Sequence, residues 1–462
     1  MFALVRLLRA HRDYRLLLLA GLVSMTGDWV LGIGLTYLVY SITGSTLASG
    51  VMLLVTFLPS ILLGSLAGVM VDRWDRRTTM IVTSLLQIVG LAPLLLVHDA
   101  SRIWVVYAVA AYQGLVEQFF GPAEQALVPH LVPEADLVSA NGVNAQVRDV
   151  ARLVGSGAGG FAAATAGIGG LAVVDAVSFA VAAGLLSLIR FRAPKPTSTS
   201  RPLVAVEAGF LRRLSGDWRD GLVTCVSSRG LRVVLSFMVI TAMGEGIMGT
   251  LFAPFVHDVL HGNGSAFGLI VGIQAVGGII GGVCVAAAGH RWSAVALFGW
   301  GSVVFGLLDL VLFLYPLLVQ GIVPAVVLMV VIGVPAACAL AGLMTTFQTL
   351  TPDTFRGRVF GALMAVRALA AVIGIAVASW LGEVVGIVPV IAFQGVGYLA
   401  GGILVLVVLG RSRTAAPRLD EHLDVDSAGG GLPPTMSPTG SVIGAPDQPG
   451  PADRRNDGGT PG

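Results

Sequence analysis

Residues 16–41 read LLLLAGLVSMTGDWVLGIGLTYLVYS, and residues 233–256 read VVLSFMVITAMGEGIMGTLFAPFV. Each stretch follows an arginine and carries one acid, Asp28 or Glu245, at the same spacing from that arginine. A helix needs about 20 predominantly apolar residues to span a bilayer. Both stretches are therefore predicted to cross a membrane, each with an acid near mid-depth.

Two further landmarks repeat at almost the same interval. Asp72-Arg73-Trp74 is followed by His290-Arg291-Trp292, and Pro133-Glu134 is followed by Pro352-Asp353. The interval between the two copies can be measured at the two arginines and at each of these two motifs. It changes by only one residue from one landmark to the next. This constancy predicts two structurally equivalent halves. Internal repetition in an apolar chain is typical of transporters, whose site lies where the halves meet.

The composition predicts an integral membrane protein. Of the 462 residues, 55% are hydrophobic and 12% are charged, whereas a soluble protein carries about 25% charged residues. Apolar runs of membrane-spanning length occur six times in each half. They predict an all-α integral membrane fold, with twelve transmembrane helices in two pseudo-symmetric six-helix bundles. The predicted spans are residues 16–41, 46–71, 78–97, 103–128, 141–166, 168–189, 233–256, 266–289, 293–315, 322–350, 359–385 and 387–410.

The spans divide the chain into four predicted parts. Residues 1–192 and 231–410 are the two bundles. Residues 193–230 are a predicted cytoplasmic linker, whose mixed apolar and basic residues suit an amphipathic helix on the membrane surface or an ordinary solvated helix. Residues 411–462 turn acidic and then rich in Gly, Pro and Ser, and are predicted to be a disordered cytoplasmic tail.

The basic residues are concentrated on one side of the predicted membrane. Of 28 Lys and Arg residues, 24 lie at the termini or in loops on the side of the termini, and only Arg102 is expected in a loop on the other side. Positive residues accumulate in cytoplasmic loops, so both termini are predicted to be cytoplasmic. The three cysteines are scattered without metal-ligand spacing, and neither a metal nor a cofactor is expected.

Three acids fall inside predicted membrane helices: Asp28, Glu117 and Glu245. A carboxylate at the bilayer centre costs at least ~2.5 kcal/mol, so such a residue normally faces a partner or a watery cavity. We interpret them as sites of proton coupling or substrate binding. The alternative is structural, either a hydrogen bond between helices or, for Glu117, an ion pair with Arg148 or Arg152 on the next helix.

Three arginines also fall inside predicted helices. Arg148 and Arg367 occupy matching positions in the two halves, and Arg152 lies one helical turn beyond Arg148. They are candidates for binding an anionic substrate or for stabilising carboxylates. Asp175 and Asp309 are expected near the outer ends of their helices, where hydration is available, and are interpreted as structural.

The loop between the second and third predicted helices carries the strongest local motif, GVMVDRWDRR over residues 68–77. It resembles the G-x-x-x-D-R-x-x-R-R signature of the major facilitator superfamily. The resemblance implies cytoplasmic contacts that lock one conformation and break in the other. Arg73 is expected to pair with an acid such as Glu124, at the inner end of the fourth helix. The implied gating residues are Gly68, Asp72, Arg73, Arg76, Arg77 and Glu124.

Shorter motifs resemble one branch of this superfamily, the macrolide-efflux and enterobactin-exporter branch of drug:proton antiporters. They include Gly27-Asp28-Trp29, Phe120-Gly121-Pro122-Ala123 and Arg356-Gly357-Arg358-Val359. The resemblance implies alternating access around a cavity lined by helices 1, 4, 7 and 10. It also implies proton-coupled efflux of drug-like or siderophore-like molecules across a bacterial inner (plasma) membrane. The expected partners are a small-molecule substrate, protons and the lipid bilayer, with no nucleic acid, and the chain is expected to be a monomer.

Other functions stay open at the level of sequence. An importer or a lysophospholipid flippase of the same superfamily fits the same pattern, and a non-transporting membrane scaffold or sensor fits it less well. An enzyme is not expected, because the sequence offers no nucleophile–base–acid set, metal spacing or phosphate-binding loop. Phe119 and Phe120 are candidates for an apolar cavity lining.

Overall fold

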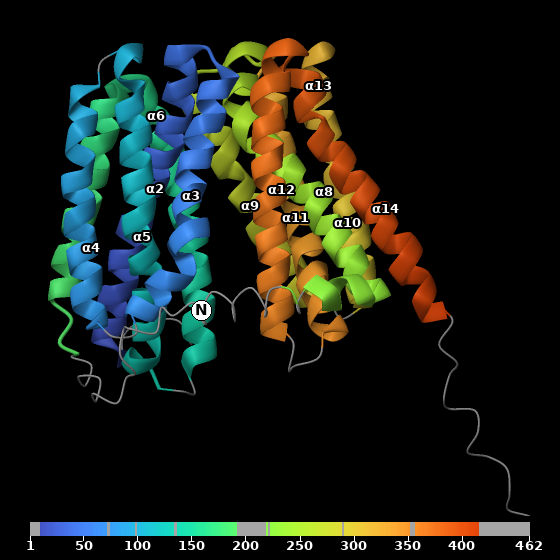
Figure 1. Cartoon of the computed structure of the whole chain (residues 1–462), viewed down its shortest axis with the longest axis horizontal. Coiled ribbons are helices and arrows are strands. Elements are labelled where there is room, and N and C mark those ends of the chain that lie inside the picture. Colours follow the sequence, from blue (N-terminus) through green and yellow to red (C-terminus); the bar gives the residue numbers. More distant parts are fainter. Residues whose placement is uncertain are drawn as a thin grey trace, which may run out of the picture. The chain divides into compact units, whose positions relative to one another are not determined.

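The computed structural model describes residues 10–71, 74–97, 99–133, 136–191, 219, 222–288, 291–351 and 356–414. Over these residues the chain forms helices and no strand (Figure 1). The predicted linker over 193–230 and the predicted tail over 411–462 lie largely outside the described residues. The boundaries of the four predicted parts therefore stay predictions.

Five helices of the described residues belong to the first half. They are α2 (Arg12–Thr43), α3 (Thr46–Val71), α4 (Arg76–Leu91), α5 (Ile103–Leu131) and α6 (Leu137–Ser187), and the 3-10 turns η1 (Ala92–Leu96) and η2 (Ala100–Arg102) join α4 to α5. α6 holds two crossings that meet at Gly167, with φ 63° and ψ −165°. Only glycine adopts this backbone conformation readily, so the predicted break between the fifth and sixth spans falls at this residue.

The second half follows the same plan. Its elements are α8 (Arg229–Pro254), the π-helical turn η5 (Phe255–Val259), α9 (Gly264–Ala288), α10 (Ala294–Leu314), the 3-10 turn η7 (Tyr315–Leu317), α11 (Val323–Leu350), α12 (Arg356–Val384), α13 (Ile387–Ile391) and α14 (Phe393–Thr414). The short α13 and the longer α14 together make the last crossing.

The twelve-helix prediction is confirmed. Ten helices of the described residues are long and apolar enough to cross a membrane. One of them is α6, which contains two crossings, and α3 adds a further crossing of 26 residues. The chain is therefore a multi-pass membrane protein that crosses the bilayer twelve times.

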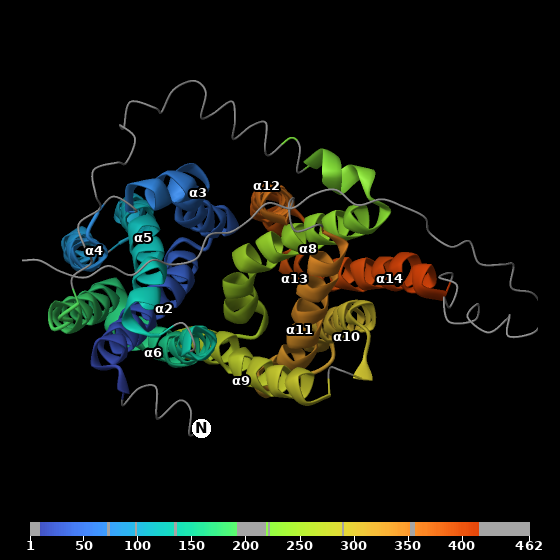
Figure 2. The ribbon, with the colours of Figure 1, turned by 90° about the horizontal axis from the view of Figure 1, so that it is seen from below.

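The helices form two bundles, α2–α6 and α8–α14 (Figure 2). In the first, α2 packs along α6, and α3 and α4 pack on α5. In the second, α10 packs on α11 and α14, and α12 packs on α8. The bundles meet where α6 lies against α9 and α3 lies against α12. The first of these contacts needs small residues, because a Cβ on Gly268 would lie 2.2 Å from the carbonyl oxygen of Ser156.

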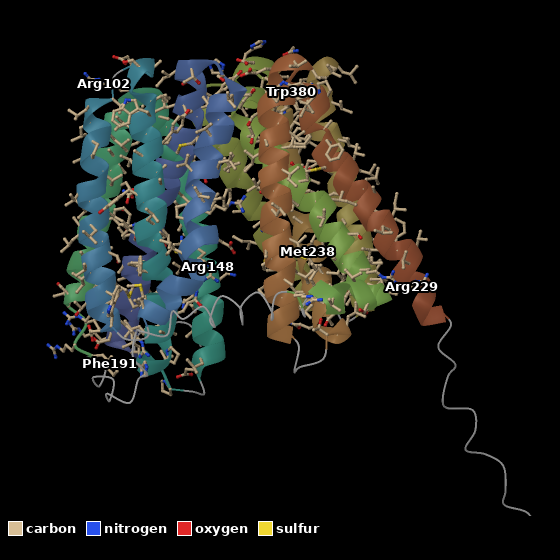
Figure 3. All side chains as sticks on the ribbon, in the orientation of Figure 1. Arg102, Arg148, Phe191, Arg229, Met238 and Trp380 are labelled. Atoms are coloured by element: carbon tan, nitrogen blue, oxygen red, sulfur yellow. The ribbon has the colours of Figure 1, made fainter. Side chains whose placement is uncertain are left out.

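An even number of crossings brings the chain back to the side on which it began. We call this the terminus side, because α2 begins and α14 ends there, and we call the opposite side the far side (Figure 1). Figure 3 places Phe191 and Arg229 toward the terminus side and Arg102 and Trp380 at the far side. Among the described arginines at helix ends, those other than Arg102 gather on the terminus side.

Candidate functional site

A cavity of about 680 Å³ lies among α2, α5 and α6, in the terminus-side half of the first bundle. This volume is within the range of about 300–1,000 Å³ that small-molecule sites occupy. The charged residues of its lining are Asp28 from α2, Glu117 and Glu124 from α5, and Arg148 from α6. The cavity thus brings together residues that the sequence predicted for proton coupling, gating and substrate binding.

Asp28, Glu117 and Asp175 form the acid cluster of the first bundle. The carboxyls of Glu117 and Asp175 are close enough to Asp28 to act on it electrostatically. Glu117 Oε2 accepts a hydrogen bond from Gln87 Nε2 at 3.3 Å, and Asp175 Oδ1 accepts one from Ser178 Oγ at 3.0 Å. The hydrogen bonds that this acid cluster accepts from described side chains therefore come from neutral groups.

Gly27 allows this cluster to form. A Cβ at Gly27 would lie 2.0 Å from Ser178 Oγ and 2.4 Å from Asp175 Oδ1. Any larger residue would push α2 away from the sixth crossing, because neither atom belongs to a long flexible side chain. The Gly-Asp pair in the first span therefore has two roles: Gly27 brings the helices together, and Asp28 contributes a carboxyl to the place where they meet.

Asp175 and Asp309 correct the interpretation made from the sequence, which placed both in hydrated outer ends. Asp175 is 0% exposed and Asp309 is 3% exposed. They lie seven and six residues inside their predicted spans, or about 10 Å at 1.5 Å per residue. Depth was therefore not decisive; both side chains lie inside their bundles, where neighbouring helices exclude water. In both Asp175 and Asp309, the Oδ2 atom has no hydrogen-bond partner among the described residues.

Arg152 reaches the other bundle and does not pair with Glu117. Its Nη2 donates a hydrogen bond to Gln274 Oε1 on α9 at 2.7 Å. Its guanidinium carbon lies 5.5 Å from the ring centroid of Trp29, an arrangement that favours a cation. Arg152 therefore joins α2, α6 and α9 near mid-membrane.

Arg148 lies beside Glu124 and not beside Glu117, its partner in the alternative, structural interpretation. It lines the cavity and acts electrostatically on Glu124. Within the described part of the chain, neither Arg148 nor Arg152 forms an ion pair with Glu117, and Gln87 is the side chain that donates to that acid. The acids at mid-depth in the first bundle thus face no ion-pair partner among these residues.

Glu245, in the second bundle, is neutralised by a partner. Its Oε2 accepts a hydrogen bond from Arg367 Nη2 at 2.5 Å, and its Oε1 accepts one from Tyr398 Oη at 2.8 Å. The side chains of Glu245 and Arg367 are 37% and 44% exposed, so the pair remains accessible. Asp309 lies close enough to Tyr398 to act on it electrostatically. Four helices, α8, α10, α12 and α14, meet at this second cluster.

The gating motif is only partly described. Asp72 and Arg73 lie outside the described residues, as do the surroundings of Gly68. Arg77 donates hydrogen bonds to the carbonyl oxygens of Leu186, at 2.9 Å, and Ser187, at 2.5 Å. A cation is favoured at a helix C-terminus, so Arg77 ties the start of α4 to the end of α6.

The other described gating residues lie nearby. Arg76 Nη1 lies 2.6 Å from His130 Nε2 at the end of α5. Glu124 faces Gly21, where a Cβ would lie 3.2 Å from Glu124 Oε1. Glu124 thus belongs to the cavity wall, with Arg148 as its electrostatic neighbour.

Hydrogen bonds between the bundles occur from mid-membrane to the far side. Tyr40 donates to Asp258 on η5, and Tyr37 donates to the carbonyl oxygen of Gly262 at 3.2 Å. Ser45 Oγ donates to Glu383 Oε1 at 2.9 Å. These contacts join the two bundles beyond the level of the cavity, which itself lies in the terminus-side half.

Sequence reasoning missed several of these residues. Gln87 and Tyr398 have no charge to single them out, and the burial of Asp175 depends on which way its side chain points. One signal was available: Tyr40 and Asp258 are 218 residues apart, which is the repeat interval. Equivalent positions of two repeats meet near the axis that relates them, so this pair could have been predicted. Phe119 does not line the cavity, whereas Phe120 does.

Comparisons with known proteins agree with this architecture. The family described as transmembrane secretion effector matches residues 8–425. The enterobactin exporter EntS of Salmonella choleraesuis (strain SC-B67) is 24% identical over 432 residues, which cover 88% of this chain and 94% of the exporter. Macrolide efflux protein A of Streptococcus pyogenes is 21% identical over 377 residues, which cover 79% of this chain and 88% of that protein.

A solved structure shows the same fold. The crystal structure of a bacterial homologue of the iron transporter ferroportin, in an inward-facing state, matches with a TM-score of 0.68 and 15% sequence identity. The match covers 86% of this chain and 98% of that chain. At this identity the likeness concerns the fold alone.

Proposed function

Because the chain belongs to the transmembrane secretion effector family of the major facilitator superfamily, we propose that it exports drug-like or siderophore-like small molecules in exchange for protons. The family and the relatives are membrane transporters and not enzymes. Relatives named for macrolide efflux and enterobactin export support the outward direction and the class of cargo. The volume of the cavity suits one small molecule.

The proposed orientation places the terminus side in the cytoplasm of a bacterial cell, with the protein acting as a monomer in the inner (plasma) membrane. The clustering of helix-end arginines on the terminus side supports it, since positive residues accumulate in cytoplasmic loops. The cavity then lies in the cytoplasmic half, and the contacts between bundles lie at mid-membrane and in the outer half. This arrangement corresponds to an inward-facing transporter.

The acid cluster of the first bundle is the observation that carries proton coupling. Asp28, Glu117 and Asp175 lie within electrostatic reach of one another, and neutral side chains hydrogen-bond two of them. Mutual repulsion opposes ionising all three carboxyls at once. A cluster of this kind binds a proton in one environment and releases it when the environment becomes more hydrated.

We propose a different role, contact with the cargo, for the second cluster. Glu245 and Arg367 already neutralise each other and stay more than one third exposed. Such a pair offers a donor and an acceptor to a polar group of the cargo without needing a proton. Arg148, which also lines the cavity, is proposed to attract an anionic group or to stabilise the carboxyl of Glu124.

Transport then follows from alternating access. Cargo enters the cavity from the cytoplasm while the acid cluster releases its protons to that side. The bundles rock, the outer contacts between Tyr40 and Asp258 and between Ser45 and Glu383 separate, and the cargo leaves. Protons from outside neutralise the acids, and the protonated protein returns. In this conformation Arg76 and Arg77 hold the start of α4 beside the ends of α5 and α6 on the cytoplasmic side.

Everted membrane vesicles test this coupling. With a macrolide antibiotic and a catecholate siderophore as probes, we expect wild-type protein to accumulate one of them when respiration acidifies the vesicle interior. Glu117→Gln and Asp28→Asn should abolish the pH-driven accumulation and retain exchange of labelled for unlabelled probe, because exchange needs cargo binding but no net proton movement.

The controls separate the competing functions. Vesicles without the protein give the background. If Glu117→Gln and Asp28→Asn accumulate the probe as wild type does, the proposed coupling is wrong. If right-side-out vesicles accumulate the probe and everted vesicles do not, the protein is an importer.

A further inference from the structure

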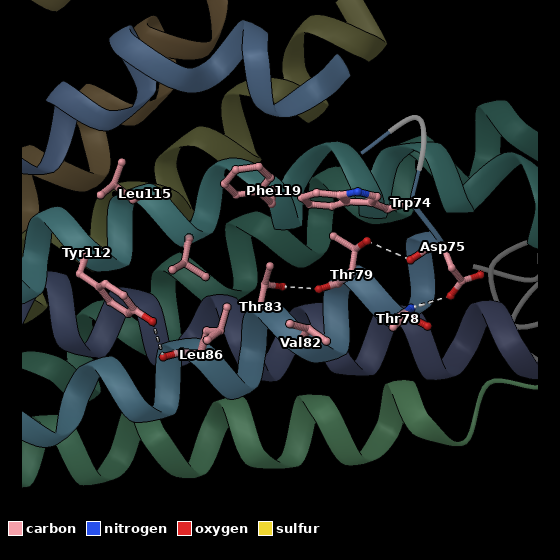
Figure 4. A pocket seen from close by; sticks show the side chains of 11 residues that line it. Trp74, Asp75, Thr78, Thr79, Val82, Thr83, Leu86, Tyr112, Leu115 and Phe119 are labelled. Carbon is pink, nitrogen blue, oxygen red and sulfur yellow. Dashed lines mark hydrogen bonds between the residues drawn. The ribbon is translucent and has the colours of Figure 1, made fainter. Parts of the chain in front are cut away.

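A groove of about 700 Å³ lies on the surface of the first bundle, between α4 and α5 (Figure 4). Its exposed walls are apolar, with Val82 and Leu86 on α4 and Leu115 on α5. At its terminus-side end the ring of Trp74 stacks on Phe119, with centroids 5.8 Å apart and planes inclined by 25°. The groove is separate from the cavity that holds Asp28 and Glu117.

Three hydroxyls in this groove are already hydrogen-bonded within the protein. Thr79 Oγ1 donates to the carbonyl oxygen of Asp75 and Thr83 Oγ1 to that of Thr79, both at 2.9 Å. Tyr112 Oη donates to the carbonyl oxygen of Leu86 at 3.1 Å. Each of these hydroxyls donates its proton to a backbone carbonyl oxygen, so the groove offers a ligand mainly apolar contact.

A second groove, of about 350 Å³, lies between α9, α10 and α11 of the other bundle. Trp292 stands at its terminus-side end, and Trp300 and Val304 line it along α10. Val334 and Cys338 of α11 form its other wall. Trp292 and Trp300 are 58% and 54% exposed, so this groove also opens on the outer surface of its bundle.

The two grooves occupy equivalent positions in the two halves. Nine lining residues of the first groove have a counterpart in the lining of the second. Along the wall of Trp74 and α4, each counterpart follows at the same interval in the sequence. Along the α5 wall, that interval is one residue longer. Trp74 corresponds to Trp292, Leu86 to Val304, and Leu115 to Val334. Two surface hollows would not coincide at nine positions by chance, so the groove is a property of the repeated unit.

The length and placement of the grooves match one leaflet of a bilayer. Leu86 lies ten residues after α4 begins at Arg76, and Val304 lies ten residues after α10 begins at Ala294, which is about 15 Å of helix. Half of a hydrocarbon core of about 30 Å is about 15 Å. Tryptophan prefers the interface between lipid and water, and both tryptophans stand at the side where the helix-end arginines gather.

We propose that each groove binds one acyl chain of a phospholipid from the leaflet on the terminus side. The chain lies along α4 or α10, with its ester end beside Trp74 or Trp292 and its methyl end beside Leu86 or Val304. The apolar walls, the satisfied hydroxyls and the one-leaflet length favour an acyl chain over polar cargo. Occurrence in both bundles favours a component of the membrane, because a transport route needs only one entrance.

Native mass spectrometry of the full chain, purified from membranes in a mild detergent, tests the proposal. Wild-type protein should retain phospholipid, up to one molecule per groove. Leu86→Trp fills the first groove and Val304→Trp fills the second, at equivalent positions. Each should lower the maximum number retained by one, and the double variant should retain none above the controls. The controls are Val89→Trp and Leu307→Trp, also equivalent and on the same helices but outside the linings.

A second pair of variants keeps the proposal testable if the first pair fails to fold. Leu115→Trp and Val334→Trp fill the same grooves from the opposite walls, and thermal unfolding identifies any variant that has lost its structure. The proposal is overturned if folded groove variants retain as many phospholipids as the controls, or if wild type retains none. A retained mass that is a transported probe and not a phospholipid would assign the grooves to cargo, which also overturns it.

Discussion

Asp28 of the first bundle and Glu245 of the second lie on equivalent helices, α2 and α8, but the side chains around them differ in charge. Around Asp28, carboxyl faces carboxyl, and neutral side chains donate the hydrogen bonds to Glu117 and Asp175. Around Glu245, a guanidinium and a phenol take both oxygens. The first arrangement sets carboxyls against one another without a cation, whereas the second pairs a carboxylate with a guanidinium.

This difference shows how two equivalent helices of a repeated fold can carry acids with different surroundings. Both halves keep an acid at the same spacing beyond an arginine in their first helix, so the repeat fixes the depth of the acid. The neighbours on the other helices then decide whether that acid lies among other carboxyls or forms an ion pair. Variants that change one of these two acids or its neighbours test whether the two have different roles.

The largest effect is expected from removing the acids themselves. Glu117→Gln should lower pH-driven transport in everted vesicles by about 100-fold, whereas Glu245→Gln should lower it by about tenfold, a difference of ~1.4 kcal/mol. Glu117 is proposed to carry the proton, and Glu245 already has a cationic partner. Equal losses in the two variants would contradict the assignment of different roles.

The next largest effect is expected from adding a side chain where α2 lies close to α6. Gly27→Ala places a methyl group where only 2.0 Å is available beside Ser178, and overpacking of this kind costs about 1–3 kcal/mol of unfolding free energy. Thermal unfolding in detergent measures the loss. Gly244→Ala, the equivalent change in the second half, meets Gln394 at 3.0 Å and should cost less.

Gly32→Ala is the matched control for that series. It lies on the same helix as Gly27, and its new Cβ would have no atom within 4 Å. It should leave stability unchanged or raise it by up to about 1 kcal/mol, since alanine favours a helix over glycine. A destabilisation as large as that of Gly27→Ala would mean that contact with Asp175 and Ser178 is not the cause.

Breaking the ion pair of the second bundle has a moderate expected effect. Arg367→Ala leaves Glu245 without its cation, and we expect transport to fall by about tenfold, or ~1.4 kcal/mol. The free energy of unfolding should change by only about 1 kcal/mol or less, because the pair is more than one third exposed. Adding Glu245→Gln should lower transport no further than either single change, because both changes remove the same pair, and a clearly larger loss in the double variant would show that Arg367 acts independently of Glu245.

The smallest effects come from removing neutral donors. Tyr398→Phe deletes a hydrogen bond of 2.8 Å to Glu245 and should cost about 1 kcal/mol of unfolding free energy. Gln87→Leu deletes a longer one of 3.3 Å to Glu117 and should cost less, by thermal unfolding. If Gln87→Leu is the more damaging change, the acid cluster depends on its neutral donors more than the geometry indicates.

Much of the site could be read from single residues, and the rest could not. Asp28, Glu117 and Glu245 stand out because a charge in an apolar run is costly wherever its helix lies. Asp175 was misjudged because its depth was readable but the direction of its side chain was not. The pairing of Glu245 with Arg367 joins residues 122 positions apart, and no local pattern distinguishes that contact from the absence of one at Glu117.

The sequence by itself determined that this protein crosses a membrane twelve times, that its halves repeat, that basic residues gather on one side, and at what depth its acids lie. Each of these follows from the transfer free energy of residues taken one after another along a helix, which depends little on neighbouring helices. Only the tertiary structure decided which acids share a cluster and which one is neutralised. Electrostatic and hydrogen-bond energies change over one or two ångströms, and those distances are set by how glycines such as Gly27 let the helices approach.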